Sequence, residues 1–388
     1  MIPRPADPSG PAAPSNDPSP RPASHGRPRN RPDPIATMKT ASLRLPIVGA
    51  ALLALAATAH AQNDRIVLHD GTVIDKVTVT GFDLRNASYR KGGGSQEVGA
   101  DMVADLQVAR VKDAYKRAEA RRSSDTGPAA FLDEADRIND KFLSQFGYAE
   151  AAKLLLRRGQ FGDAFTVLGE LQQKYPDSGF LPLTYSAKID YYLSKGKSGA
   201  SDAAKVAAEY ETASQTKGYP MGFQLEARFY KLLAQAVAGD LEGSRLESAM
   251  RTLAGEAARY PQVADRARLA IADVKRANGD SAGAEEVYAE ILGKDNSSAA
   301  VRAGAYLGMG QVLMAKGTRT DTEPYREALL NFLRVYLETP DAPSSTIAQA
   351  LDLGAQAAEK WGGEDSGRMN GYLKYRLRTD YPEYEPAK

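Results

Sequence analysis

The fold is decided by residues 146–176, which read FGYAEAAKLLLRRGQFGDAFTVLGELQQKYP. Apolar residues recur here at helical spacing, which predicts two helices with one apolar stripe each: Leu154, Leu155, Phe165, Leu168 and Leu171. Gly159 separates the two helices because glycine adopts a left-handed C-cap at low cost. Pro176 ends the second helix at the residue before it. A lone hairpin of this size cannot bury its stripe, so we expect further copies of it.

The composition limits the classes of function. A chain of 388 residues suggests two or three domains. The formal net charge is +1, so no basic excess indicates a nucleic-acid partner. The sequence holds no cysteine, which excludes disulfides, thiolate metal sites, cysteine nucleophiles and a lipid anchor on an N-terminal cysteine. We expect neither a cofactor nor a metal ion.

The N-terminal region contains two segments that we do not expect in the folded protein. Residues 1–37 hold half of the 22 prolines, which predicts disorder; a start at Met38 would make them an extension of the gene model. Residues 38–61 are typical of a signal peptide, with a positive start, an apolar run and small residues before a cleavage site near Ala61. A membrane anchor is the alternative, although the apolar run is short for a span. We therefore expect a periplasmic or otherwise secreted protein with no transmembrane segment in the mature chain.

Removal of residues 1–61 changes the charge balance and the histidine content. This segment contains seven of the 50 Lys and Arg residues and three of the 49 Asp and Glu residues, so the remainder is slightly acidic. It also contains two of the three histidines, which leaves His69 alone. A single histidine weighs against hydrolases that use histidine as a base or a metal ligand.

Residues 64–108 predict a small β module. Asp70-Gly71 lies between two runs of alternating apolar residues, which is a hairpin signal, and the glycines at 92–94 mark another turn. Short strands without helices favour a small barrel or a strongly bent sheet. Through the segment DGTVI, residues 70–74, the module resembles Sm-like and SH3-like barrels. That resemblance implies assembly or peptide binding; a packing cap for the helices is the alternative.

Residues 109–128 predict a charged helix and a linker. The segment ARVKDAYKRAEARR, residues 109–122, has little apolar face, and SSDTGP, residues 123–128, is a linker by composition. The basic residues of the helix could contact anionic lipid or cell wall. A solvated helix is the simpler interpretation.

Residues 129–382 predict about six helical hairpins of roughly 40 residues each. A glycine follows an apolar helix in each unit: Gly159, Gly196, Gly239, Gly279, Gly317 and Gly363. Helix-ending pairs recur at Tyr175-Pro176, Tyr260-Pro261, Thr339-Pro340 and Tyr381-Pro382. An ordinary helical bundle, in which glycine and proline only mark loops, is the alternative.

The first unit resembles tetratricopeptide repeats, because matching residues stand at the spacing of that family: Tyr148, Ala152, Gly159, Ala164 and Pro176. The fourth and fifth units, around Gly279 and Gly317, match in part. The resemblance implies a mainly α fold, a TPR-like α-solenoid whose first helices line a concave groove. With the exported leader, the chain is similar to periplasmic Tol-Pal accessory proteins. It is also similar to outer-membrane assembly lipoproteins, but it lacks their cysteine.

The resemblance also implies which residues face the groove: Phe146, Ala149, Lys153, Leu156 and Arg157 in the first unit, and Arg266, Asp273, Arg276 and Gln311 in later units. Lys153 and Arg157 are four residues apart on one helix face, where two cations could hold a carboxylate such as a peptide C-terminus. Solvated charges on an exposed face are the alternative.

The sequence carries no recognisable catalytic set. It has no GxSxG, HExxH or P-loop motif, and His69 has no companions for a metal or nucleophile site. We therefore expect a non-enzymatic extracytoplasmic scaffold that binds a protein or peptide in the groove, within a cell-envelope complex. One alternative is peptidoglycan or polysaccharide binding through the β module, with the cell wall as partner. Another is a glycan hydrolase with two carboxylates about 5–10 Å apart.

Overall fold

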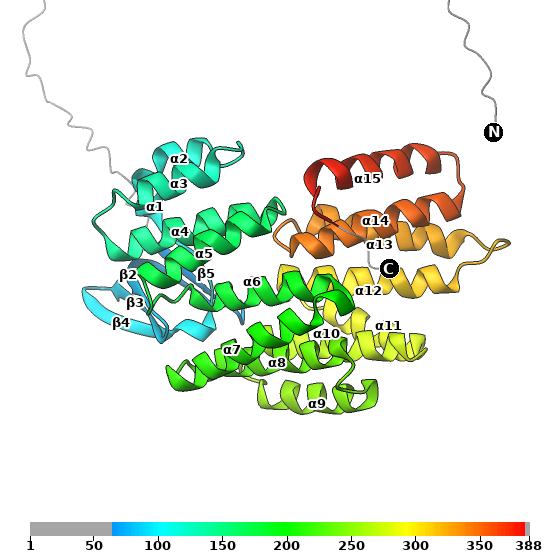
Figure 1. Ribbon diagram of the computed structural model, residues 1–388, viewed down its shortest axis with the longest axis horizontal. Coiled ribbons are helices and arrows are strands. Elements are labelled where there is room, and N and C mark those ends of the chain that lie inside the picture. Colours follow the sequence, from blue (N-terminus) through cyan, green and yellow to red (C-terminus); the bar gives the residue numbers. More distant parts are fainter. Residues whose placement is uncertain (1–63, 385–388) are drawn as a thin grey trace, which may run out of the picture. The chain divides into compact units, whose positions relative to one another are not determined.

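The computed structural model describes residues 64–384. The predicted segments 1–37 and 38–61 lie outside the described residues. Within residues 64–384 the protein is mainly helical, with a small antiparallel sheet at the N-terminal end, as the sequence predicted. Figure 1 shows the sheet beside the first helices and the later helices following one another along the chain.

The sheet has five strands in the order β4-β3-β2-β1-β5, with antiparallel neighbours. Their bounds are β1 (Asp64–Leu68), β2 (Val73–Phe82), β3 (Asn86–Lys91), β4 (Gly94–Gly99) and β5 (Val103–Gln107). Strand β2 pairs with β1 through its first half and with β3 through its second half, and both pairings contain an irregular register. Such register shifts bend a strand, and bent strands occur in both forms that the sequence favoured, a small barrel and a strongly bent sheet. A short 3₁₀ turn, η1 (Ala100–Met102), joins β4 to β5.

The segment after the sheet differs from its prediction. In place of one solvated helix, α1 (Ala109–Ala114) and α2 (Lys116–Ala120) are separated at Tyr115, which is fully buried. The Tyr115 hydroxyl donates to the Leu143 carbonyl at 2.7 Å, which ties this segment to the helices. The predicted linker is also shorter, because its Gly127 and Pro128 begin α3 (Gly127–Ala135), where proline is tolerated in the first turn.

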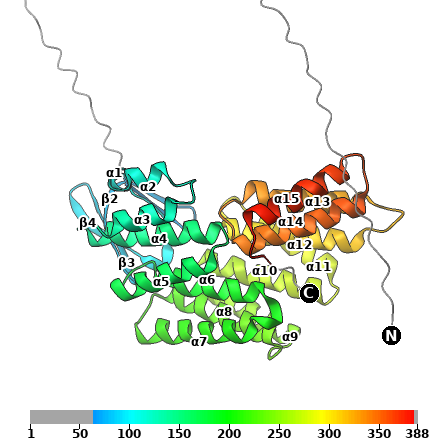
Figure 2. The ribbon, with the colours of Figure 1, turned by 45° about the horizontal axis from the view of Figure 1, so that its top comes forward.

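The predicted repeat region contains six consecutive helix pairs, whose members are joined by short loops. They are α4 (Lys141–Arg157) with α5 (Phe161–Lys174), α6 (Leu181–Ser194) with α7 (Ala200–Thr216), α8 (Met221–Ala238) with α9 (Gly243–Glu256), α10 (Pro261–Ala277) with α11 (Ser281–Leu292), α12 (Ala299–Lys316) with α13 (Glu323–Glu338), and α14 (Ser344–Trp361) with α15 (Ser366–Asp380). Each of these helices packs against its neighbours in the chain. Figure 2 shows the same succession from a second direction.

The turn glycines agree with the prediction in part. Gly159, Gly196, Gly239 and Gly279 have a positive φ, as a left-handed cap requires. At the end of α14 this conformation belongs to Gly362 rather than Gly363. Gly317 has φ −66°, and its lack of a side chain serves another purpose: a Cβ there would meet the ring of Tyr325.

The apolar core lies between successive helices. One cluster of buried residues is shared by the β module and the helices up to α10. A second lies between α10, α11 and α12 around the fully buried Tyr288, and a third joins α12 to α15 around Phe332. The second and third clusters each join helices that follow one another in the chain, so these helices bury apolar surface against their neighbours.

Two long-range connections position the cavities described below. The Asp101 carboxylate accepts from the backbone N–H of Gly222 at 2.8 Å, and the Gln262 amide donates to the Asp101 carbonyl at 2.8 Å, so η1 is fixed to α8 and α10. The segment before α14 returns to the first helix pair. There Arg157 pairs with Asp341 at 3.1 Å, and the Ser344 hydroxyl donates to the Leu156 carbonyl.

Candidate functional site

Two neighbouring cavities lie between alternate helices. The first, of about 570 Å³, is walled by the even-numbered helices α6, α8, α10, α12 and α14. The second, of about 670 Å³, lies mainly between α4, α6 and the segment 341–345. The two share several lining residues: Leu183, Ser186, Asp190, Ala300 and Pro343. Strand β5 contributes Val103 to the first cavity and Asp105 to the second. Both volumes fall in the range of ligand pockets in proteins.

Polar side chains in the first cavity form a cluster around the Arg266 guanidinium. Nη1 lies 3.0 Å from Glu226 Oε1, and Nη2 lies 3.6 Å from Asp190 Oδ1 and donates to the Tyr230 hydroxyl. The guanidinium also stacks on the rings of Phe229 and Tyr230, at 4.8 and 4.5 Å from their centroids. Arg266 is therefore held by both charge and packing.

The remaining oxygens of the two acids are partly satisfied by tyrosines. The Tyr230 hydroxyl donates to Asp190 Oδ2 at 3.0 Å, and the Tyr210 hydroxyl donates to Glu226 Oε2 at 2.8 Å. A third acid, Asp273, accepts from the Tyr288 hydroxyl at 2.6 Å. Apolar side chains form much of the wall around these groups: Phe223, Leu233, Leu269 and Leu307.

The three carboxylates are enclosed by helices yet accessible from the cavity. Burial raises the pKa of Asp190 and of Glu226, although Arg266 acts in the opposite direction on both. Burial also raises the pKa of Asp273, opposed by its hydrogen bond from Tyr288. Nevertheless the side chain of Asp190 is 33% exposed and that of Asp273 is 48% exposed. An added positive charge in the cavity would stabilise their ionised forms.

His69 also lines the first cavity. Burial lowers its pKa to about 4, and the neighbouring Asp70 only partly opposes this. The imidazole is therefore neutral at pH 7, so it adds no positive charge to the wall.

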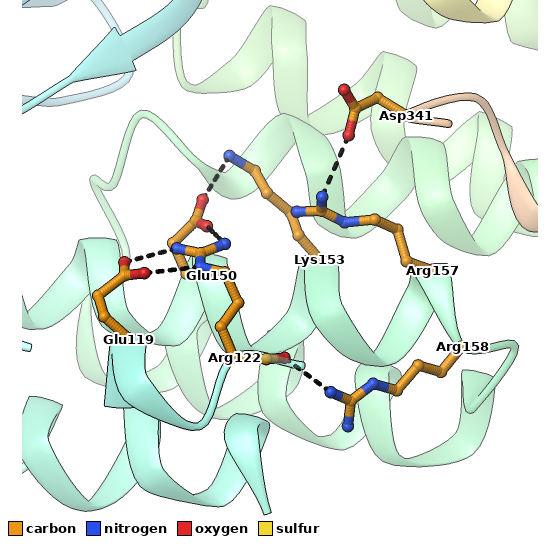
Figure 3. Close-up of polar contacts among 7 residues, drawn as sticks. All are labelled: Glu119, Arg122, Glu150, Lys153, Arg157, Arg158 and Asp341. Carbon is orange, nitrogen blue, oxygen red and sulfur yellow. Dashed lines mark hydrogen bonds and ion pairs between the residues drawn. The ribbon is translucent and has the colours of Figure 1, made fainter. Parts of the chain in front are cut away.

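Lys153 and Arg157 line the second cavity, but each already pairs with a carboxylate of the chain. Figure 3 shows Lys153 turned toward Glu150 and Arg157 turned toward Asp341. The Lys153 ammonium lies 3.0 Å from Glu150, which Arg122 also contacts at 3.0 Å. Burial alone would raise the pKa of Glu150, but Lys153 and Arg122 together hold it below its usual value.

The other predicted groove residues lie in several places. Leu156 lines the second cavity, whereas Arg266, Asp273 and Gln311 line the first. Arg276 is 4.0 Å from Asp273 and does not belong to the lining of either cavity.

The prediction that Phe146 and Ala149 face the groove is wrong. Ala149 is fully buried. Phe146 is 8% exposed and packs edge-on against Phe142 and Phe180. Helix α4 packs against α3, α5 and β2, and Phe146 belongs to the core cluster between them.

Sequence reasoning did not find Asp190, Glu226 or Tyr230. All three lie in the second and third helix pairs, where long turns obscured the register of the repeat. A usable signal was present, because Asp190 and Glu226 are the single acids of two helical stretches rich in apolar and aromatic residues, TYSAKIDYYL and MGFQLEARFY. Acids on a helix face that neighbouring helices cover indicate a buried pair or a lined cavity.

No protein-family model matches the chain, and a search of curated proteins found none that matches it. Within residues 64–384, no helix combines the length and apolar character needed to cross a membrane. The same residues contain no group of three or more His, Cys, Asp or Glu side chains arranged to hold a metal ion.

Proposed function

We propose that this protein is a non-enzymatic extracytoplasmic scaffold that binds a segment of a protein or peptide partner in its two cavities. In this proposal the six helix pairs are a TPR-like α-solenoid, with the small β module, similar to an SH3-like barrel, as its N-terminal cap. The main support for the proposal is that the first helices of five pairs line the first cavity together: α6, α8, α10, α12 and α14. Repeat proteins present ligands with such a shared inner surface.

The chemistry of the walls supports binding of a chain segment. Large apolar side chains supply contact area, and a few polar groups converge between them, which is the usual composition of a recognition site. The two cavities meet at shared residues such as Ser186 and Asp190. An extended segment could therefore occupy both.

Location in the cell envelope rests on the sequence. The leader pattern in residues 38–61 and the absence of cysteine support an exported chain without a lipid anchor on cysteine. A periplasmic scaffold similar to Tol-Pal accessory proteins fits both features.

The two other interpretations receive less support from the geometry. For glycan hydrolysis, Asp190 and Glu226 are a candidate carboxylate pair, but Arg266 contacts both carboxylates. For polysaccharide binding by the β module, Val103 and Asp105 of β5 face the cavities, and Asp101 binds α8. Both features fit a module that packs against the helices.

A selection of random linear peptides on the full-length chain tests the proposal. Selected peptides should bind the wild type in fluorescence anisotropy and lose binding to Ala300→Trp, because Ala300 lines both cavities and an indole there obstructs the place where they meet. The matched control is Ala208→Trp, at an exposed position of α7. It should bind as the wild type does. A selection that yields no binder, or binders that Ala300→Trp does not affect, would refute the proposed function.

A further inference from the structure

The charges that line the two cavities are unbalanced. Among residues 64–384, six carboxylates face them: Asp105, Glu150, Asp190, Glu226, Asp273 and Asp341. In the same part of the chain, three cations face them: Lys153, Arg157 and Arg266. Cations behind the walls compensate in part, since Arg122 pairs with Glu150 and Arg276 lies 4.0 Å from Asp273. The cavities therefore carry a net negative charge at neutral pH.

Asp190 is one of the acids whose charge the cations of the chain balance incompletely. It shares Arg266 with Glu226, and Glu226 is the closer of the two, at 3.0 Å against 3.6 Å. Its carboxylate accepts one hydrogen bond, from Tyr230, and so keeps lone pairs for a further donor. Asp190 also lines both cavities and a third, smaller one beside them. A ligand that enters from any of the three reaches this carboxylate.

We propose that the segment bound in the cavities is basic, and that a Lys or Arg side chain of this segment binds the Asp190 carboxylate. This inference rests on the proposed function, because it specifies the chemistry of the occupant of that site. The stem of a Lys or Arg side chain packs along apolar walls such as Phe223 and Leu233, while its charged end reaches the acid. An ammonium or guanidinium at Asp190 relieves the repulsion between Asp190 and Glu226.

The same geometry disfavours an acidic ligand. Lys153 and Arg157 are each engaged by a carboxylate of the chain, and Arg266 is engaged by two. An incoming carboxylate would have to displace one of these acids and would add to the negative charge of the cavities. The carboxylate clamp suggested by the spacing of Lys153 and Arg157 is therefore replaced by recognition of a cation.

The test uses the peptides from the selection, compared with the unselected library. Cavity-binding peptides, defined by their loss on Ala300→Trp, should be enriched in Lys and Arg and depleted in Asp and Glu. Replacing the critical Arg of a selected peptide by Gln should weaken binding to the wild type by roughly tenfold to a hundredfold, the range for a hydrogen bond to a charged group.

A variant of the protein locates the contact. Asp190→Asn keeps an acceptor for Tyr230 and should weaken the Arg peptide to the level of the Gln peptide, with little effect on the Gln peptide itself. Asp202→Asn, the same substitution at an exposed position of α7, serves as the matched control and should change neither affinity.

Each result separates the two proposals. Cavity binders without Lys or Arg enrichment, or equal binding of the Arg and Gln peptides, would overturn the inference and leave the proposed function standing. An Arg preference that Asp190→Asn does not reduce would also overturn it. Absence of any cavity binder would instead refute the proposed function. The comparison of Arg and Gln peptides on the wild type needs no protein variant, so it tests the preference for a basic segment even if Asp190→Asn misfolds.

Discussion

The cluster around Arg266 offers the sharpest stability prediction. Arg266→Met keeps an unbranched side chain that still packs on Phe229 and Tyr230, but it removes the charge that Asp190 and Glu226 share. Arg266 is 22% exposed and Glu226 is 18% exposed, so the pair is largely withdrawn from solvent. Breaking a buried ion pair on one side costs about 3–5 kcal/mol. We expect a loss of about 3 kcal/mol, the lower end, because the cavity admits water.

The measurement is urea unfolding followed by circular dichroism, with the slope compared between variants. The triple variant Arg266→Met, Asp190→Asn, Glu226→Gln should recover at least half of the loss, because no unpaired charge then remains. A loss below about 1 kcal/mol for the single variant, or no recovery in the triple variant, would refute a charge cluster that stabilises the fold.

The pH dependence of the single variant provides an independent check. Without Arg266, the pKa values of Asp190 and Glu226 should rise further above their ordinary values of 3.8 and 4.5. A folded-state pKa above the unfolded value favours the folded state as the pH falls through it. The loss caused by Arg266→Met should therefore shrink as the pH is lowered from neutrality toward those values. A loss that grows on acidification contradicts this assignment.

Three further perturbations test other parts of the structure. Gly308→Ala places a Cβ against the ring of Tyr288 in the core, whereas Gly169→Ala meets open space. In urea titrations, Gly308→Ala should be at least about 1 kcal/mol less stable than Gly169→Ala. Equal stabilities of the two variants would contradict the close contact between Gly308 and Tyr288. The pKa of His69 is lowered to about 4, so the stability it contributes is present above its ordinary pKa of 6.5 and is lost as the pH falls toward 4. Between pH 6.5 and about pH 4, His69→Gln should lose less stability than the wild type does. Parallel curves of stability against pH for the two proteins would show that His69 does not cause the loss. Arg157→Ala removes an exposed ion pair with Asp341 and should change the free energy of unfolding by less than about 1 kcal/mol. Thermal melts at low and high salt check this. A large loss of stability that persists at high salt would show that the contact between Arg157 and Asp341 stabilises the fold.

Much of the local structure follows from short-range rules that the sequence displays. Helices end before Pro176, Pro340 and Pro382 because proline disfavours the α conformation at the preceding residue. The prediction for Tyr260-Pro261 is wrong, since α9 already ends at Glu256 and Pro261 begins α10. Asp70-Gly71 forms the first turn of the sheet, with Gly71 at φ 87° and Asp70 accepting from the backbone of Thr72 at 2.8 Å. These features need only neighbours in the chain, so a single sequence is sufficient to predict them.

The site was predicted less well because it depends on contacts between distant residues. Arg266 was placed on the inner surface from the repeat spacing, but its partners Asp190 and Glu226 lie in other helix pairs with irregular turns. The contact of Arg157 with Asp341 joins residues 184 positions apart and could not be read from local pattern. For the same reason Arg157 looked like a free cation in the sequence, whereas the partner of Lys153, Glu150, lies only three residues away on the same helix and was overlooked.

The location of a bound segment tests the central claim most directly. The chain has no cysteine, so single-cysteine variants can be labelled without background. Ser186→Cys reports on α6 where both cavities meet, and Ser201→Cys reports on the exposed start of α7. A saturating selected peptide should slow thiol labelling at position 186 and leave position 201 unchanged. Equal labelling rates at position 186 with and without peptide, or protection at position 201 alone, would place the partner outside the helix-lined cavities.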